Sequence, residues 1–135
     1  MCPVYINRIA SIHAESSNEK PYFSAQEPDY KEMITNANLR RRMSRMIKMG
    51  VACGLECLKD ISPEKVDAII TATGLGCLAD TEKFMNALMD NREQMLNPTA
   101  FIQSTFNTVG AQLALLLKIH AYNRSEEHTS ELQSL

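Results

Sequence analysis

The sequence predicts one α/β domain, and three stretches of the chain carry that prediction. Between Leu39 and Ile61 apolar residues recur at three- and four-residue steps, which is the spacing of one face of a helix. The run VDAIITAT at 66–73 is short, β-branched and bounded by turn residues, which is typical of a buried strand. Residues 109–119 are apolar on nearly every side, which predicts a buried helix. Helices around a buried strand indicate an α/β layered architecture.

Composition limits the classes of function. The chain has 135 residues, 44% of them apolar, which is enough for one hydrophobic core. Its 14 basic and 16 acidic residues give a net charge of −2, so we expect neither nucleic acid nor membrane as a partner. The sequence has no uncharged apolar run of about 18 residues and no secretory start, so we expect a cytoplasmic protein. Four sparse cysteines predict neither a disulfide framework nor a metal site, and no cofactor is expected.

The amino-terminal part predicts a strand followed by a loop. Residues 4–12 alternate apolar and polar side chains, which predicts a strand, although Arg8 interrupts the alternation. Serine, asparagine and proline residues between His13 and Tyr30 predict an exposed loop.

The stretch from Leu39 to Asp60 is predicted to be one continuous helix. Gly50 and Gly54 lie one turn apart on its apolar face, and each glycine costs about 1 kcal/mol of helix stability relative to alanine. We therefore predict that both glycines face inward and that another backbone packs closely against them.

Turn and cap residues divide the rest of the chain. The glycine turn at 74–76 follows the predicted strand directly. Asp80 is predicted to cap a second helix, and Pro98 to end that region. Asn107 is predicted to cap the last helix.

The composition changes after Tyr122. Residues 124–135, RSEEHTSELQSL, contain no Ile, Val or aromatic residue. Residues 124–134 are identical to the translation of a common sequencing-library adapter, so we interpret 124–135 as an adapter-derived or disordered tail; a natural acidic tail is the alternative. On this interpretation residues 1–123 are a fragment of a longer protein, and deleting the tail should change stability by less than about 1 kcal/mol.

Few residues indicate catalysis by their pattern alone. The TGLG turn lacks the Lys and Ser/Thr of a phosphate-binding loop and the third glycine of a dinucleotide fingerprint. Cys53 and Cys57 lie among apolar residues, which favours packing over metal binding. Cys77 begins a helix, where a thiol is acidified, but no histidine base is identifiable, and His13 and His120 are assigned structural roles. We therefore assign no catalytic residue.

A local basic cluster lies in the predicted central helix. Its members are Arg40, Arg41, Arg42, Arg45 and Lys48. Arg41, Arg45 and Lys48 share one helical face, opposite the apolar stripe. A solvated face is the default interpretation, and a dock for an acidic partner is the functional one.

The order of these pieces resembles the N-terminal part of the β-ketoacyl synthases. The resemblance rests on VDAIITATGLG at 66–76 and on PTAFIQSTFNTVGAQLALLLKIHAYN at 98–123, and it covers nearly all of residues 1–123. It is closest to synthase-like proteins of aryl-polyene and flexirubin pigment clusters. The resemblance implies a partial thiolase-like fold, the N-terminal portion of an α-β-α-β-α layered architecture, and a dimer.

The resemblance also implies a reaction and a set of site residues. Family members perform a decarboxylating Claisen condensation on acyl carrier protein, with a cysteine nucleophile and two histidines that would lie beyond this stretch. The segment is therefore expected to be inactive alone. The implied acyl-pocket and dimer-interface residues are Leu75, Gln103, Ser104, Thr105, Phe106 and Asn107, with plain core packing as the alternative. The basic cluster would dock the acidic carrier protein.

Three functions remain open at the level of sequence. The parent is a synthase, a noncatalytic chain-length-factor-like partner in a heterodimer, or a free-standing binding module unrelated to condensation. The expected dimer is a homodimer or a heterodimer with a synthase subunit. A nucleophilic cysteine further along the chain would favour the first function, and its absence the second.

Overall fold

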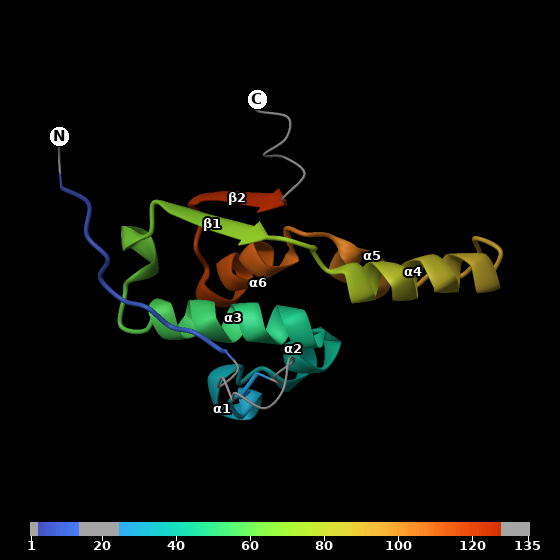
Figure 1. Cartoon of the computed structure of the whole chain (residues 1–135), viewed down its shortest axis with the longest axis horizontal. Helices are drawn as coiled ribbons and strands as arrows, with labels where there is room; N and C mark the ends of the chain where they lie inside the picture. Colours follow the sequence, from blue (N-terminus) through green and yellow to red (C-terminus); the bar gives the residue numbers. More distant parts are fainter. Residues whose placement is uncertain (1–2, 14–24, 128–135) are drawn as a thin grey trace, which may run out of the picture.

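The computed structural model describes residues 3–13 and 25–127, which form a two-stranded sheet with helices on one side of it (Figure 1). The elements, in chain order, are α1 (Tyr30–Met33), α2 (Ala37–Arg42), α3 (Arg45–Cys57), the 3₁₀ turn η1 (Pro63–Lys65), β1 (Ala68–Thr73), α4 (Leu78–Asp90), α5 (Pro98–Ser104), α6 (Thr108–Leu117) and β2 (Tyr122–Glu127).

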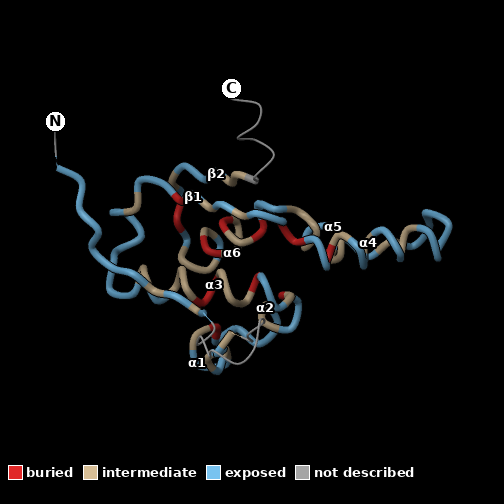
Figure 2. The backbone as a smooth tube through the Cα atoms, in the orientation of Figure 1, coloured by how far each residue is buried: buried red, intermediate tan, exposed pale blue. Residues whose placement is uncertain are grey.

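The two strands are parallel, in a register that pairs Ala68 with Tyr122 and Thr73 with Glu127. Parallel neighbours need a long crossover, and here α4, α5 and α6 supply it. In Figure 1, α6 lies between the sheet and α3, and α4 and α5 extend away from this body. The buried residues gather where α3, α6 and β1 meet (Figure 2). The α/β class predicted from the sequence is confirmed.

The contact between α3 and α6 explains the two glycines. A Cβ on Gly50 would lie 2.8 Å from Val109 Cγ1, and one on Gly54 would lie 2.5 Å from Leu113 Cδ1. Both distances are shorter than carbon atoms tolerate, so the helices approach this closely only where α3 has no side chain. The prediction that the glycines face inward is confirmed, but the atoms that meet them belong to side chains of α6 and not, as predicted, to a backbone.

The prediction of one helix from Leu39 to Asp60 is wrong. Two helices, α2 and α3, occupy this stretch, and Met43 between them has an extended backbone with ψ 134°. Met43 is buried with Ile47 in the core, so the break turns its side chain inward. Because apolar residues continue at helical spacing across the break, periodicity could not reveal it.

The predicted strand at 4–12 is also wrong, since residues 3–13 have no regular secondary structure. An alternating pattern makes a strand only where a neighbouring strand supplies hydrogen bonds, and no strand within residues 3–13 and 25–127 pairs with this segment. Arg8, which interrupts the alternation, has a contact of its own. Its guanidinium donates to the carbonyl oxygens of Glu56 (3.3 Å) and Lys59 (2.5 Å), and so interacts with the end of α3.

The helix starts differ in detail from the predictions. Asp80 does not cap α4, which begins earlier with Cys77 at its N-cap. Pro98 begins α5 rather than ending a region, and the side chain of Asn97 caps it by accepting from the Thr99 N–H (2.9 Å). Asn107 occupies the predicted N-cap of α6 but makes no capping hydrogen bond with its side chain.

The segment 124–135, interpreted from the sequence as an adapter-derived or disordered tail, begins inside a strand of the structure. Residues 124–127 belong to β2, which pairs with β1 along its whole length. Strand pairing uses backbone groups, so a polar sequence can form it without adding to the core. The hydroxyls of Thr71 and Ser125 also hydrogen-bond across the sheet (2.6 Å). Residues 128–135 lie outside the described residues.

The strand β1 is covered on one face only, although its sequence predicts burial on both. Ile69 is 8% exposed, whereas Ile70 on the opposite face is 69% exposed. Among the described residues, no single helix is long and apolar enough to cross a membrane. Taken together, α5 and α6 are long and apolar enough to cross a membrane, but the two helices are bent by 108° relative to each other.

Candidate functional site

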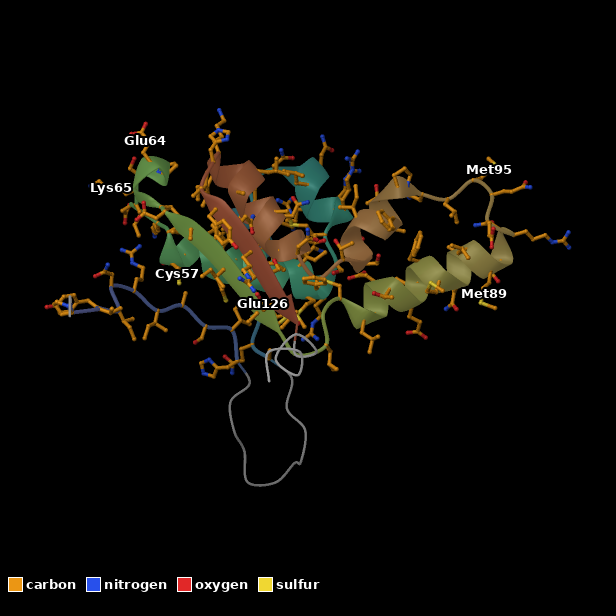
Figure 3. The ribbon with its side chains drawn as sticks, turned by 90° about the horizontal axis from the view of Figure 1, so that it is seen from above. Cys57, Glu64, Lys65, Met89, Met95 and Glu126 are labelled. Carbon is orange, nitrogen blue, oxygen red and sulfur yellow. The ribbon has the colours of Figure 1, made fainter. Side chains whose placement is uncertain are left out.

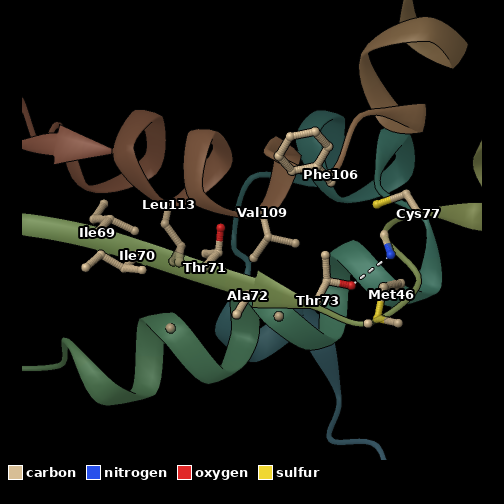
Figure 4. A pocket seen from close by; sticks show the side chains of 14 residues that line it. Met46, Ile69, Ile70, Thr71, Ala72, Thr73, Cys77, Phe106, Val109 and Leu113 are labelled. Atoms are coloured by element: carbon tan, nitrogen blue, oxygen red, sulfur yellow. Dashed lines mark hydrogen bonds between the residues drawn. The ribbon is translucent and has the colours of Figure 1, made fainter. Parts of the chain in front are cut away.

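An apolar groove of about 540 Å³ lies between β1, α3 and α6 (Figure 4). One wall is the glycine face of α3, and the other comprises Val109 and Leu113 of α6. The strand β1 runs along its length, and Cys77 and Phe106 stand at the carboxyl end of that strand. Ligands of α/β proteins commonly bind at the carboxyl ends of strands, which makes this groove the candidate site.

The turn that closes this end requires a glycine. Gly76 has φ 56°, in the left-handed region that side chains disfavour, and it is buried. Its N–H donates to Thr73 Oγ1 (2.9 Å; dashed line in Figure 4), so the strand end and the turn are tied together. A Cβ on Gly74 would meet nothing within 4 Å. Only the second glycine of the TGLG turn is therefore required by its backbone.

Leu75, the predicted acyl-pocket residue, is 68% exposed and does not line the groove. The glycines on either side of it do line the groove. Its assignment to an acyl pocket stays a prediction.

The predicted segment 103–107 is divided by the structure. Phe106 lines the groove. Gln103 lines a smaller cavity of about 110 Å³ between α2, α5 and α6, and Asn107 lines a third hollow beside β2. Ser104 and Thr105 use their hydroxyls locally, donating to the carbonyl oxygens of Phe101 (2.7 Å) and Ile102 (2.9 Å). Only Phe106 shares the groove with the glycine turn.

Cys77 lines the groove but is poorly suited to act as a nucleophile. Its residue is 6% exposed, and burial, together with the nearby Asp80 carboxylate, raises the pKa of its thiol. A raised pKa keeps the thiol protonated, opposite to what nucleophilic attack requires. His13 hydrogen-bonds Ser11, and His120 lines a different cavity, so neither is placed as its base. Within residues 3–13 and 25–127, no group of three His, Cys, Asp or Glu side chains could hold a metal ion.

The basic cluster is split between α2 and α3, and its members have different partners. Arg45 Nε donates to Glu27 Oε1 (2.5 Å), a carboxylate that also accepts from the Tyr30 hydroxyl (2.6 Å). These two hydrogen bonds, the one from Tyr30 first, lower the pKa of Glu27. The Arg40 guanidinium donates to the Ile34 carbonyl oxygen. Arg45 is therefore paired with a carboxylate within the chain.

One cation of this surface lies outside the basic cluster predicted from the sequence. Lys31 lines a shallow hollow together with Arg40, Arg41 and Lys48. It lies in α1, nine residues before Arg40, and only the folding of α1 against α3 brings it there. Arg42 instead lines the small cavity between α2, α5 and α6. No periodicity within one helix could have identified Lys31.

The layered α/β body shares its fold with a solved ketosynthase structure, which confirms the expected partial thiolase-like fold. The chain matches a chain of the complex of the ketosynthase ApeO with its chain length factor ApeC from Xenorhabdus doucetiae, at a TM-score of 0.59 and 23% identity. The match covers 83% of this chain and 45% of that chain, so this chain spans less than half of its structural neighbour.

The family follows from the sequence comparison. The profile of the family "Beta-ketoacyl synthase, N-terminal domain" matches residues 13–128, which is most of the chain. The chain belongs to this family, and the resemblance stated from the sequence is confirmed. No curated protein matches the chain.

Proposed function

We propose that this chain is the N-terminal part of a 3-oxoacyl-acyl-carrier-protein synthase that performs a decarboxylating Claisen condensation in fatty-acid or polyene-type biosynthesis. The observation that carries the proposal is the apolar groove at the carboxyl end of β1, in a chain whose family is that of the β-ketoacyl synthases. A long acyl chain needs an apolar channel, and the lining supplies one. A cytoplasmic location and an acyl-carrier-protein partner belong to the same proposal.

The described residues alone are proposed to lack condensing activity. Condensation needs a thiolate, and burial holds the pKa of Cys77 above its ordinary value. The test incubates the chain with acyl- and malonyl-carrier protein and follows acyl adducts by mass spectrometry and carbon dioxide release. We expect neither. An adduct on Cys77 that disappears in Cys77→Ser, with carbon dioxide released, would contradict this proposal.

A noncatalytic, chain-length-factor-like role is the second candidate function. The structural neighbour is a complex of a ketosynthase with its chain length factor, so relatives of this fold occur in mixed pairs. The two candidates differ in one measurement. When the parent is incubated with acyl-carrier protein, a synthase subunit takes up the acyl group on a cysteine of its own, whereas a chain-length partner stays unmodified and the acyl group is found on the synthase subunit paired with it.

The basic surface is proposed to dock the acidic carrier protein. Lys31, Arg41 and Lys48 share one hollow, and none of them has a carboxylate within ion-pair distance in the described part of the chain. We expect the double variant Arg41→Glu/Lys48→Glu to weaken carrier-protein binding about tenfold at low salt, and less at high salt. Lys65→Glu, a charge reversal at an exposed site in η1, is the matched control. Equal affinities of both variants for the carrier protein would show that this surface does not dock it.

Leu75 is proposed to limit the acyl chain that the parent accepts. A bulkier aromatic side chain at this position should shorten the products, because in the parent its added volume would narrow the acyl pocket that Leu75 is proposed to border. Product lengths are measured by mass spectrometry for Leu75→Phe and for Leu115→Phe, a control at a leucine of α6 that is 70% exposed and does not line the groove. Unchanged product lengths for Leu75→Phe would show that Leu75 does not border the acyl pocket.

A further inference from the structure

The small cavity of about 110 Å³ between α2, α5 and α6 is separate from the apolar groove. In the view of Figure 3, these three helices lie together on the side of β1 away from residues 3–13. The cavity combines apolar walls with polar side chains from all three helices. The polar residues are Arg42 of α2, Thr99 and Gln103 of α5, and Thr108 and Gln112 of α6.

The side-chain carbonyl oxygen of Gln112 lacks a donor. Its Oε1 is buried and accepts no hydrogen bond from the residues that the structure describes. The Thr108 hydroxyl, one turn earlier on α6, is engaged by the Ile102 carbonyl oxygen (2.5 Å). Folded proteins rarely leave a buried amide oxygen unpaired, because it loses its hydrogen bonds to water. Gln112 therefore needs a donor from within this cavity.

Arg42 brings donors to the same cavity. Arg40, Arg41 and Arg45 each bond an oxygen atom of the chain. Within the described part of the chain, no hydrogen bond or ion pair engages the Arg42 guanidinium. Arg42 is also the one charged residue that the structure places on the lining. A guanidinium with five N–H donors and an acceptor without a donor thus share one space.

We propose that buried water fills this cavity and joins the Arg42 guanidinium to Gln112 Oε1, with the Gln103 side-chain amide as a third partner. Water donates to the carbonyl oxygen and accepts from the guanidinium, which is what the two groups require. One buried water needs about 10 to 15 Å³ and about two to four polar partners, and this cavity offers both. Arg42 is then a positioning residue that ties α2 to α6, and not a contact for the carrier protein.

The water bridge matters most for α2. This helix has six residues, none of them buried, and a helix so short does not persist in water by itself. It carries Arg41 of the basic surface, whereas α6 supplies Val109 and Leu113 to the groove. The bridge therefore holds the basic surface in a fixed position relative to a wall of the groove.

A double-mutant cycle in the full chain tests the connection. Arg42→Met and Gln112→Leu each remove one end of the bridge and keep a side chain of similar length. We expect their effects on the equilibrium constant of unfolding to be non-additive by at least about threefold, because either variant alone breaks the bridge. Arg41→Met combined with Gln112→Leu is the control pair and should be additive, since Arg41 bonds Asn38 within α2 (2.8 Å). Additive effects in both pairs would overturn the proposal.

The variant Gln112→Glu gives a readout that a change in general stability does not move. We expect the pKa of the new carboxyl to lie below its ordinary value, because the Arg42 guanidinium stabilises the charged form. When Arg42→Met is added, the pKa should lie above that value, since the cavity then buries the carboxylate without a cation. Carbon-13 NMR of the carboxyl group measures both values. The same pKa in the two backgrounds would overturn the proposal.

The water itself is detected by nuclear Overhauser effects between long-lived water and side-chain amide protons. We expect these effects for Gln103 and Gln112 in the wild type, because water held in a cavity stays near its partners longer than surface water does. The side chain of Gln94, an exposed residue, is the control and should show none. Non-additivity of Arg42→Met and Gln112→Leu without such effects would overturn the water bridge, because the two side chains would then bond each other directly.

Discussion

The contact between α3 and α6 and the hairpin of α4 and α5 are built from similar apolar helices but are packed differently. In the first, glycines of α3 receive Val109 and Leu113, and Leu113 is 5% exposed. In the second, Phe84 and Phe101 meet with ring centroids 5.5 Å apart, yet Phe101 remains 56% exposed. An apolar stripe therefore shows that a helix has an apolar face available for packing. Whether that face is buried within this chain depends on a neighbouring helix of complementary shape.

The largest effect is expected from filling the space over α3. Gly54→Val should destabilise the protein by about 2 to 3 kcal/mol, because the new Cβ would overlap Leu113, which is buried and has little room to move. Urea unfolding measures the change. Adding Leu113→Ala to this variant should recover part of the loss, since it removes the overlapping atoms. Gly74→Ala is the control, because a Cβ there meets nothing within 4 Å. A double variant less stable than both single variants would contradict the close contact.

A smaller effect is expected in the hairpin. Phe84→Ala removes the aromatic pair with Phe101 and should cost about 1 to 2 kcal/mol, less than a fully buried phenylalanine costs. Met89→Ala, at a site 72% exposed on the same helix, should stay within about 0.5 kcal/mol. If Phe84→Ala destabilised the protein more than Gly54→Val, the hairpin would be the better packed of the two regions.

The smallest effect is expected from Cys77, which lies where α4 meets the α3–α6 contact. Its thiol should make the stability of the protein depend on pH. The folded state raises the thiol pKa above its ordinary value of 9.0, so folding favours the protonated thiol. This contribution is complete below that value and is lost as the pH rises through the folded pKa. Urea midpoints at pH 7.5 and pH 10 should therefore fall less in Cys77→Ala than in the wild type. An identical fall of the urea midpoint in both proteins would show that Cys77 does not contribute to the pH dependence of stability.

The groove shows how far sequence could lead to the candidate site. The glycine turn, Phe106 and Cys77 each stand in a motif that the sequence displays, and all three line the groove. Lys31 could not be assigned to the basic surface, because folding alone brings α1 beside α2 and α3. The pairing of Arg45 with Glu27 could not be predicted from the sequence either, since 18 residues separate them.

The sequence by itself determined that the stretch 66–73 carries a strand, that the stretch 109–119 carries a helix, and which face of α3 bears the glycines. These properties depend on side-chain periodicity and backbone freedom, which are local. The tertiary structure decided that the central helix breaks at Met43, that residues 124–127 pair with β1 and that residues 4–12 lie unpaired in the structure. Each of these outcomes depends on a partner distant in the chain. The break depends on a core that accepts the Met43 side chain, and a strand depends on a neighbour whose backbone groups are free to pair.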